Sequence, residues 1–141
     1  MRDMMNCCTP KRAISPAAAT TDNTAFVSQI IDVQGYDSLT FLIQTGSLAD
    51  ADATFTTLVE HGDDSSLTDA AAVADAELLG TEALASFTFA DDNKCFKIGY
   101  VGSKRYVRLT VTPANNSGNA FVSAIALLGH PAQRPTANPP A

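Results

Sequence analysis

The stretch KRYVRLTVT, residues 104–112, alternates apolar and polar side chains over its length. Val107, Leu109 and Val111 fall on one side of an extended chain, and more polar residues stand between them. A period of two residues is typical of a β-strand that buries one face and exposes the other. The stretch therefore predicts a strand at the edge of a hydrophobic core.

Six other stretches are rich in Val, Ile, Phe and Thr and are bounded by turn-forming residues, which is typical of strands. They are AFVSQIIDV (25–33), SLTFLIQTG (38–46), ATFTTLVEHG (53–62), SFTFA (86–90), KCFKIGYVG (94–102) and NAFVSAIALLGH (119–130). Residues 119–130 are apolar on both sides and predict a central strand. In residues 38–46, Leu42 interrupts the polar side, which indicates a second, partly covered face.

A series of short strands separated by turn signals favours an all-β fold. We expect an antiparallel β-sandwich of the jelly-roll type. Gly102-Ser103 predicts a tight hairpin between residues 94–102 and 104–112, because Gly followed by a polar residue is typical of two-residue hairpin turns.

The length of 141 residues predicts one domain, with its folded body at residues 25–130. Residues 1–24 have small residues and prolines but no periodicity, and predict an extended N-terminal arm. Residues 131–141, PAQRPTANPPA, predict a Pro-rich C-terminal tail. The chain has neither the apolar core of a signal peptide nor a run long enough to span a membrane. We therefore expect a cytoplasmic protein without membrane contact.

Residues 65–83 leave two alternatives open. Their Ala, Leu and Glu residues favour a short helix that ends at Gly80, with Thr68 and Asp69 placed to cap it. The other alternative is an edge strand preceded by a loop. The all-β setting favours the extended alternative.

The residue types used in catalysis and metal binding are scattered. His61 and His130 each stand beside a glycine at the end of an expected strand, where a histidine is usually a solvated turn residue. Cys7 and Cys8 are adjacent and Cys95 is alone, a spacing unlike that of a zinc site or a disulfide framework. The acidic pairs, Asp50 with Asp52, Asp63-Asp64 and Asp91-Asp92, fall in expected turns, where Asp is an ordinary residue. We expect no enzyme activity, no cofactor and no metal.

Positive charge is concentrated in one short segment, residues 94–108. Its members are Lys94, Lys97, Lys104, Arg105 and Arg108. Residues 13–93 have no Lys or Arg, although all but one of the 15 acidic residues lie there. The net charge of −6 disfavours nucleic acid as a partner, because the chain as a whole would be repelled.

Two alternatives therefore remain for the basic segment: pairing with acids of its own chain, or contact with the acidic loops of another copy. Across the expected hairpin, Lys97 and Arg108 could come close on the outer face of the sheet. The residues expected at an intermolecular interface are Lys11, Arg12, Lys97, Lys104, Arg105, Tyr106 and Arg108.

Four motifs resemble those of the small capsid-associated proteins of tailed bacteriophages and gene transfer agents, the decoration or head-spike-base proteins. They are IDVQGYDSLTFLIQTG (31–46), LLGTEA (78–83), KIGYVGSKRYVRLTVTP (97–113) and AIALLGHPAQRP (125–134). The resemblance implies a structural virion protein on the outside of an icosahedral capsid, assembled in the cytoplasm of a bacterial host. It implies a cyclic homo-oligomer, a trimer or a pentamer, that binds the major capsid protein and stabilises the shell or forms the base of a spike or fibre.

A second function is a carbohydrate-binding jelly-roll module used for adhesion to a host surface. Such modules usually stack a sugar ring on an exposed aromatic side chain. The chain has no Trp and three Tyr residues, which weakens this alternative.

Overall fold

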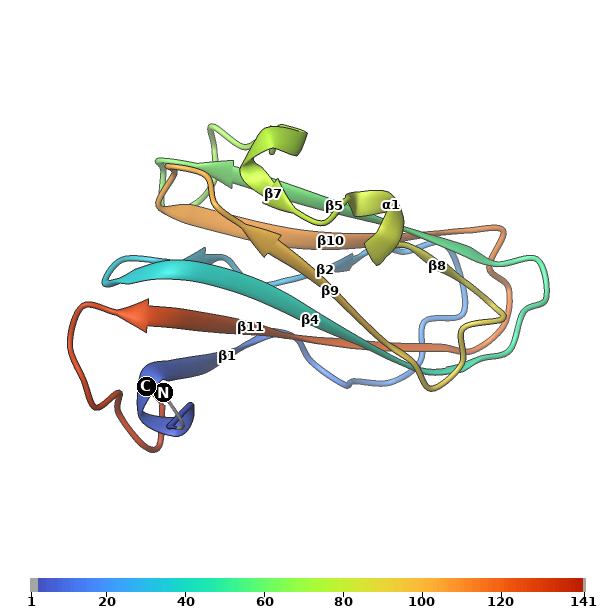
Figure 1. Ribbon diagram of the computed structural model, residues 1–141. Coiled ribbons are helices and arrows are strands. Elements are labelled where there is room, and N and C mark those ends of the chain that lie inside the picture. The colour runs from blue at the N-terminus through green and yellow to red at the C-terminus, as the bar shows by residue number, and fades with distance from the viewer. Residues whose placement is uncertain (1–2, 141) are drawn as a thin grey trace.

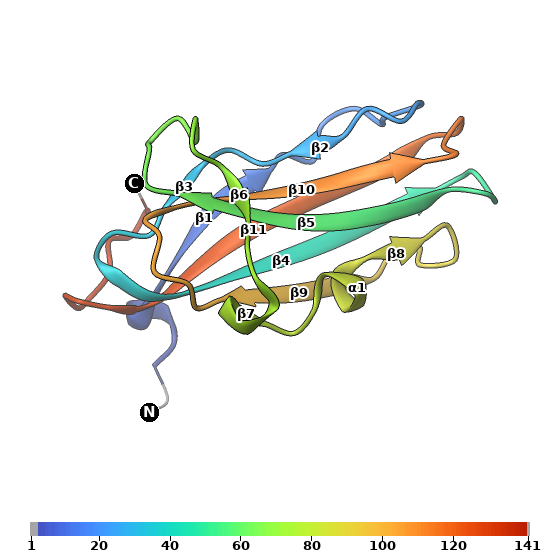
Figure 2. The same ribbon diagram turned by 90° about the horizontal axis from the view of Figure 1, so that it is seen from above.

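The computed structural model describes residues 3–140 and has two antiparallel sheets packed face to face (Figures 1 and 2). Sheet A has the order β1 (Cys8–Ile14), β11 (Ala120–Pro131), β4 (Tyr36–Leu48), β9 (Cys95–Tyr100) and β7 (Leu78–Leu79). Sheet B has the order β2 (Phe26–Val27), β10 (Tyr106–Ala114), β5 (Thr54–Gly62) and β6 (Ala71–Ala72), with β3 (Ile31–Asp32) also paired to β10 and β8 (Phe87–Thr88) to β5. The predicted antiparallel β-sandwich is confirmed.

The core lies between the sheets and is built by the alternation seen in the sequence. On β10, Val107, Leu109 and Val111 are fully buried, and the residues between them are half-buried on the outer face. Phe41 and Ile43 of β4 join the same cluster from sheet A. As predicted, β11 is a central strand, hydrogen-bonded to β1 on one side and to β4 on the other.

The predicted hairpin at Gly102-Ser103 is wrong. Strand β9 belongs to sheet A and β10 to sheet B, so the connection steps from one sheet to the other. The Tyr100 side chain shapes this step: its hydroxyl accepts a hydrogen bond from the Lys104 amide at 3.0 Å and lies 3.2 Å from the Lys104 carbonyl oxygen. A Cβ on Gly102 would lie 2.6 Å from the Tyr100 ring, so the close approach requires glycine.

Part of the expected arm is a strand of the sandwich. After a short 3-10 helix, η1 (Met5–Cys7), strand β1 pairs with β11 and buries Thr9, Ala13 and Ile14. An edge strand tolerates a proline, which explains how Pro10 fits there. Residues 1, 2 and 141 of the expected arm and tail lie outside the described residues.

The described part of the tail has no regular structure beyond the end of β11. It returns to the N-terminal segment, where the Thr136 hydroxyl donates a hydrogen bond to the Cys8 carbonyl at 2.9 Å and the Thr136 amide donates to the Asn6 carbonyl at 3.1 Å. The tail is therefore anchored beside η1.

Residues 65–83 contain pieces of both alternatives. They include β6, a 3-10 helix η2 (Asp75–Glu77) and β7, and the helix α1 (Glu82–Ala85) follows. The helix α1 is capped by Thr81 and begins beyond Gly80, where the helix of the first alternative was expected to end, so it is not that helix. The helix covers part of the edge of β5, because the Glu82 carboxylate accepts a hydrogen bond from the Val59 amide at 2.7 Å. Among residues 3–140, no helix is long and apolar enough to cross a membrane.

The expected strand at residues 25–33 is split into β2 and β3. Ser28 stands at the break, where its hydroxyl accepts a hydrogen bond from the Leu109 amide at 2.9 Å and its own amide donates to the Leu109 carbonyl at 2.8 Å. A side chain thus replaces one backbone partner and interrupts the ladder.

Candidate binding surfaces

Most of the basic segment is neutralised within the chain. Arg105 donates two hydrogen bonds to Asp32, at 2.9 and 2.8 Å, and Arg108 donates two to Glu60, at 3.1 and 2.8 Å. Two further ion pairs within residues 3–140 join Lys94 to Asp91 and Lys104 to Asp63. The intrachain alternative therefore accounts for four of the five cations in residues 94–108.

The Arg105–Asp32 pair has a clear electrostatic signature. The hydrogen bonds from Arg105 hold the pKa of Asp32 below its ordinary value, and the same contact raises the pKa of Arg105. The guanidinium carbon also lies 5.0 Å from the centre of the Tyr106 ring, a cation–π contact. These contacts fix both side chains against sheet B.

The seven expected interface residues do not form one surface. Lys104 and Arg105 lie in the β9–β10 connection, and Tyr106 and Arg108 lie on sheet B. Lys97 and Arg12 are exposed on sheet A, whereas Lys11 is half-buried on β1. Because β9 and β10 belong to different sheets, the expected approach of Lys97 to Arg108 on one outer face is excluded.

The outer face of sheet A has a row of four residues in direct cross-strand register: Arg12, Ile125, Leu42 and Lys97. Ile125 is 47% exposed and Leu42 is 38% exposed. Arg12 donates hydrogen bonds to Ser15 and Gln29, and neither Arg12 nor Lys97 forms a salt bridge among the described residues. The sequence analysis did not predict this apolar row with a cation at each end. Two signals pointed toward it: Leu42 on the polar side of its strand, and the apolar character of both sides of residues 119–130.

The middle of this row is hollowed. A shallow depression of about 400 Å³ lies over β4, β9 and β11, and Leu42, Phe96, Lys97 and Ile125 are among its lining residues. A second depression, of about 550 Å³, adjoins it along β9 and reaches the exposed Leu79 and Leu84. We call the depression at Leu42 and Ile125 the hollow.

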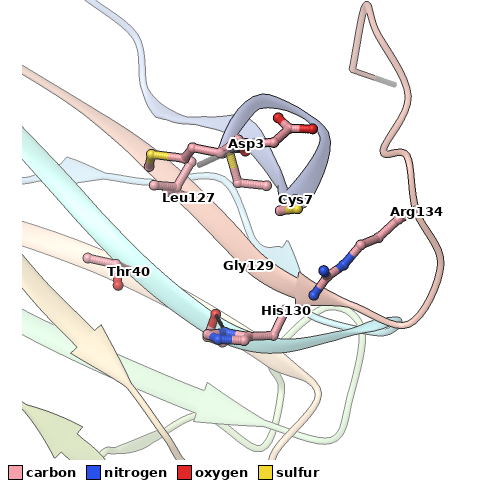
Figure 3. A pocket seen from close by; sticks show the side chains of 10 residues that line it. Asp3, Cys7, Thr40, Leu127, Gly129, His130 and Arg134 are labelled. Carbon is pink, nitrogen blue, oxygen red and sulfur yellow. Dashed lines mark hydrogen bonds between the residues drawn. The ribbon is translucent and has the colours of Figure 1, made fainter. Parts of the chain in front are cut away.

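A separate cleft of about 370 Å³ lies where η1 and the start of the tail meet the ends of β4 and β11 (Figure 3). Its lining includes Asp3, Cys7, Ser38, His130 and Arg134. The Ser38 hydroxyl and His130 Nδ1 lie 2.9 Å apart and are hydrogen-bonded. Within residues 3–140, no carboxylate hydrogen-bonds to the His130 ring, so the pair lacks the orienting acid of a catalytic triad.

The two histidines differ in their surroundings. His130 is exposed at the surface, as predicted, whereas the prediction of a solvated turn residue is wrong for His61, which is 8% exposed. His61 Nδ1 lies 2.9 Å from the Tyr100 hydroxyl, and the two rings meet edge to face. The contact joins β5 of sheet B to β9 of sheet A, so His61 has a structural role at the sheet-to-sheet step.

The acidic pairs lie in loops, where carboxylates of these pairs accept hydrogen bonds from neighbouring residues. Asp50 accepts hydrogen bonds from the Asp52 amide and from Ser117, Asp64 from Ser66, and these bonds lower the pKa of both side chains. In the described part of the chain, no group of three or more His, Cys, Asp and Glu side chains could hold a metal ion.

No family model matches the chain, and no curated protein matches it in sequence. Among solved structures it is similar to a xylan-binding module, CBM15, with 11% identity, a TM-score of 0.44 and coverage of 93% of this chain and 95% of the module. It is similar to the SPBc2 prophage-derived protein YomS, with 12% identity, a TM-score of 0.46 and coverage of 89% and 99%. It is also similar to the CBM32 of AlyQ in complex with 4,5-unsaturated mannuronic acid, with 12% identity, a TM-score of 0.37 and coverage of 85% and 98%. Likenesses at this level do not identify a function.

Proposed function

We propose that the chain is a structural virion protein, without enzyme activity, that binds the exterior of a phage-type capsid as a cyclic homo-oligomer. The observation that carries the proposal is the outer face of sheet A, where Leu42 and Ile125 are exposed between two cations that form no salt bridge among the described residues. Contiguous exposed apolar surface on a soluble protein usually marks an interaction site. The resemblance of the four sequence motifs to capsid-associated proteins supports the choice of partner.

Of the basic segment, only Lys97 contributes to this proposal. Arg105 and Arg108 already have acidic partners on sheet B, so using them for assembly would require breaking two ion pairs. Lys97 and Arg12 have no such partner among residues 3–140, and they flank the apolar row. The charge that is available for docking is therefore on sheet A.

The proposal is tested by purifying particles from the strain that encodes the chain and measuring its ratio to the major capsid protein by mass spectrometry. A ratio near one per capsid subunit supports a protein that covers the shell. A ratio of a few per hundred supports a base for spikes at the vertices. Absence from purified particles overturns the proposal.

A pair of double variants then tests the surface. Leu42→Glu with Ile125→Glu should abolish incorporation into particles, because both side chains face outward from sheet A. Thr56→Glu with Thr112→Glu is the matched control, since these two exposed residues face each other on sheet B. Equal incorporation of both double variants would contradict docking through sheet A.

The second candidate is a carbohydrate-binding module, and the hollow is the observation in its favour, since a depression over a sheet can take an extended ligand. The tyrosines weaken this candidate, because Tyr100 is buried and the ring of Tyr106 contacts the Arg105 guanidinium. Binding on a glycan array that is lost in the Leu42→Glu, Ile125→Glu variant would favour this candidate over capsid docking.

A further inference from the structure

The edge of sheet A next to the hollow has the opposite charge. Residues 75–84 run through η2 and β7 into α1 along the free side of β9 (Figure 2), and we call them the ridge. Leu79 is 62% exposed and Leu84 is 74% exposed. Asp75 and Glu77 precede them, and neither forms a salt bridge among the described residues. The ridge therefore presents two large apolar side chains beside two acids, of which Asp75 has no basic partner among the described residues and Glu77 also interacts electrostatically with Lys104.

The hollow presents the complementary set. Leu42 and Ile125 are apolar side chains of its lining, Lys97 also lines it, and Arg12 lies on β1 at the other end of the row. A protein–protein interface usually has apolar side chains at its centre and a polar rim, and charges of opposite sign face each other across it. The ridge has negative charges and the row at the hollow has positive charges, so the two surfaces are complementary.

Ridge and hollow cannot satisfy each other within one chain. They lie side by side on sheet A, separated by the depression along β9 that Leu79, Leu84 and Lys97 line together. Ridge and hollow are held apart by the strand pairing of β7 with β9 and of β9 with β4. Each copy can therefore contact one neighbour through its ridge and a second neighbour through its hollow. Such head-to-tail contacts form a ring when the rotation between copies closes.

We propose that the occupant of the hollow is the ridge of a second copy of this chain. The inference rests on the proposed function for the homo-oligomer and assigns the hollow to the contact between copies, so the Leu42→Glu, Ile125→Glu variant would lose incorporation into particles through loss of the oligomer. The contact would also give Lys97, the one cation of the basic segment without a salt bridge among the described residues, and Arg12 an acidic neighbour.

The test uses two charge-reversed forms of the full chain. The ridge variant is Asp75→Lys with Glu77→Lys, and the hollow variant is Arg12→Glu with Lys97→Glu. The control is Asp37→Lys with Asp52→Lys, which changes the net charge as the ridge variant does, at exposed acids that form no salt bridge among the described residues. Circular dichroism checks the fold of each form.

We expect the wild type and the control to be oligomers by light scattering, with masses that are multiples of 14.8 kDa. Each reversed form alone should dissociate, with self-association weakened by more than about tenfold, because like charges then face each other across the contact. An equal mixture of the two should associate again by native mass spectrometry, as pairs or open chains in which the two forms alternate, because each contact between unlike forms then joins opposite charges. A closed ring of three or five copies cannot alternate in this way. Leu79→Asp with Leu84→Asp is a second ridge variant, should the first not fold.

A monomeric wild type, unchanged oligomers in both reversed forms, or a mixture that stays dissociated would overturn the inference. A monomeric wild type whose incorporation into particles is lost in the hollow variant means that the capsid itself occupies the hollow. Capsid binding then stands without the inference, and the homo-oligomer of the proposed function does not. An oligomer held by ridge and hollow that is absent from particles leaves the inference standing and overturns the proposed function.

Discussion

The outer faces of sheets A and B differ in how their charged side chains are satisfied. On sheet B, Arg108 lies directly across from Glu60 and is hydrogen-bonded to it, and the strands around the pair expose threonines. On sheet A, Lys97 lies directly across from Leu42, and the row continues to Ile125. The comparison teaches that charge clustered along a sequence is not necessarily free for a partner, because most of this cluster is paired within the chain. The proposed docking surface rests instead on charges without a partner among the described residues beside exposed apolar side chains.

The largest expected effect separates the inside of the sandwich from the outer face of sheet A. Leu109→Ala removes a fully buried side chain on β10 and should lower the free energy of unfolding by about 2–5 kcal/mol, through lost burial and the cavity left behind. Ile125→Ala should change the stability of the dilute monomer by less than about 1 kcal/mol, because the side chain is 47% exposed. Urea unfolding of both variants measures the difference. A loss at Ile125 as large as that at Leu109 would mean that this face is covered within the monomer.

The next effect concerns the step that links the two sheets. Tyr100→Phe leaves His61 Nδ1 and the Lys104 amide without their hydroxyl partner, and should cost about 1–3 kcal/mol. Tyr36→Phe is the control: it removes one hydrogen bond, from Thr9, in a half-buried site, and should cost about 0.5–1.5 kcal/mol. Equal losses of unfolding free energy in urea would show that the Tyr100 hydroxyl stabilises the connection between the sheets no more than an ordinary hydrogen bond does.

Local pattern in the sequence was enough to predict several elements. The period of two found β10, and the apolar character of both sides of residues 119–130 correctly placed β11 between two strands. Leu42 indicated the partly covered face of β4, because an apolar side chain interrupts the polar side there. Each of these depends on residues that are near each other in the chain.

Contacts between distant residues could not be predicted. Gly102-Ser103 signals a turn but does not specify which sheet the next strand enters, and that depends on Tyr100 meeting His61. The partners of the basic segment lie 41 to 73 positions away for Lys104 and Arg105, so the sequence could not decide between pairing within the chain and contact with another copy. Strand β1 was missed because Pro10, Lys11 and Arg12 obscure its alternation.

A smaller effect compares the two faces directly. Arg108→Ala leaves the half-buried Glu60 without its partner and should lower stability by about 1 kcal/mol. Lys97→Ala should have an effect near zero, because Lys97 has no acidic partner among the described residues. A double-mutant cycle with Glu60→Ala isolates the coupling in the Arg108 pair. A coupling of zero would remove the electrostatic distinction between the faces, even if the sandwich is unchanged.

The smallest effect is the pH dependence contributed by the ion pair at Asp32. Its pKa is lowered in the folded chain, chiefly by the hydrogen bonds from Arg105, so the folded state binds this proton less readily than the unfolded state does. The pair's contribution is therefore fully present above the unfolded pKa, near 3.8, and is lost as the pH falls through the lower folded value. Asp32→Asn and Arg105→Met should each lose less stability than the wild type as the pH is lowered from about 5 to about 3, measured by urea unfolding at each pH. Because either substitution removes the same pair, matching shallow slopes would assign the acid sensitivity to it, and a wild-type slope in both variants would exclude the pair as its source.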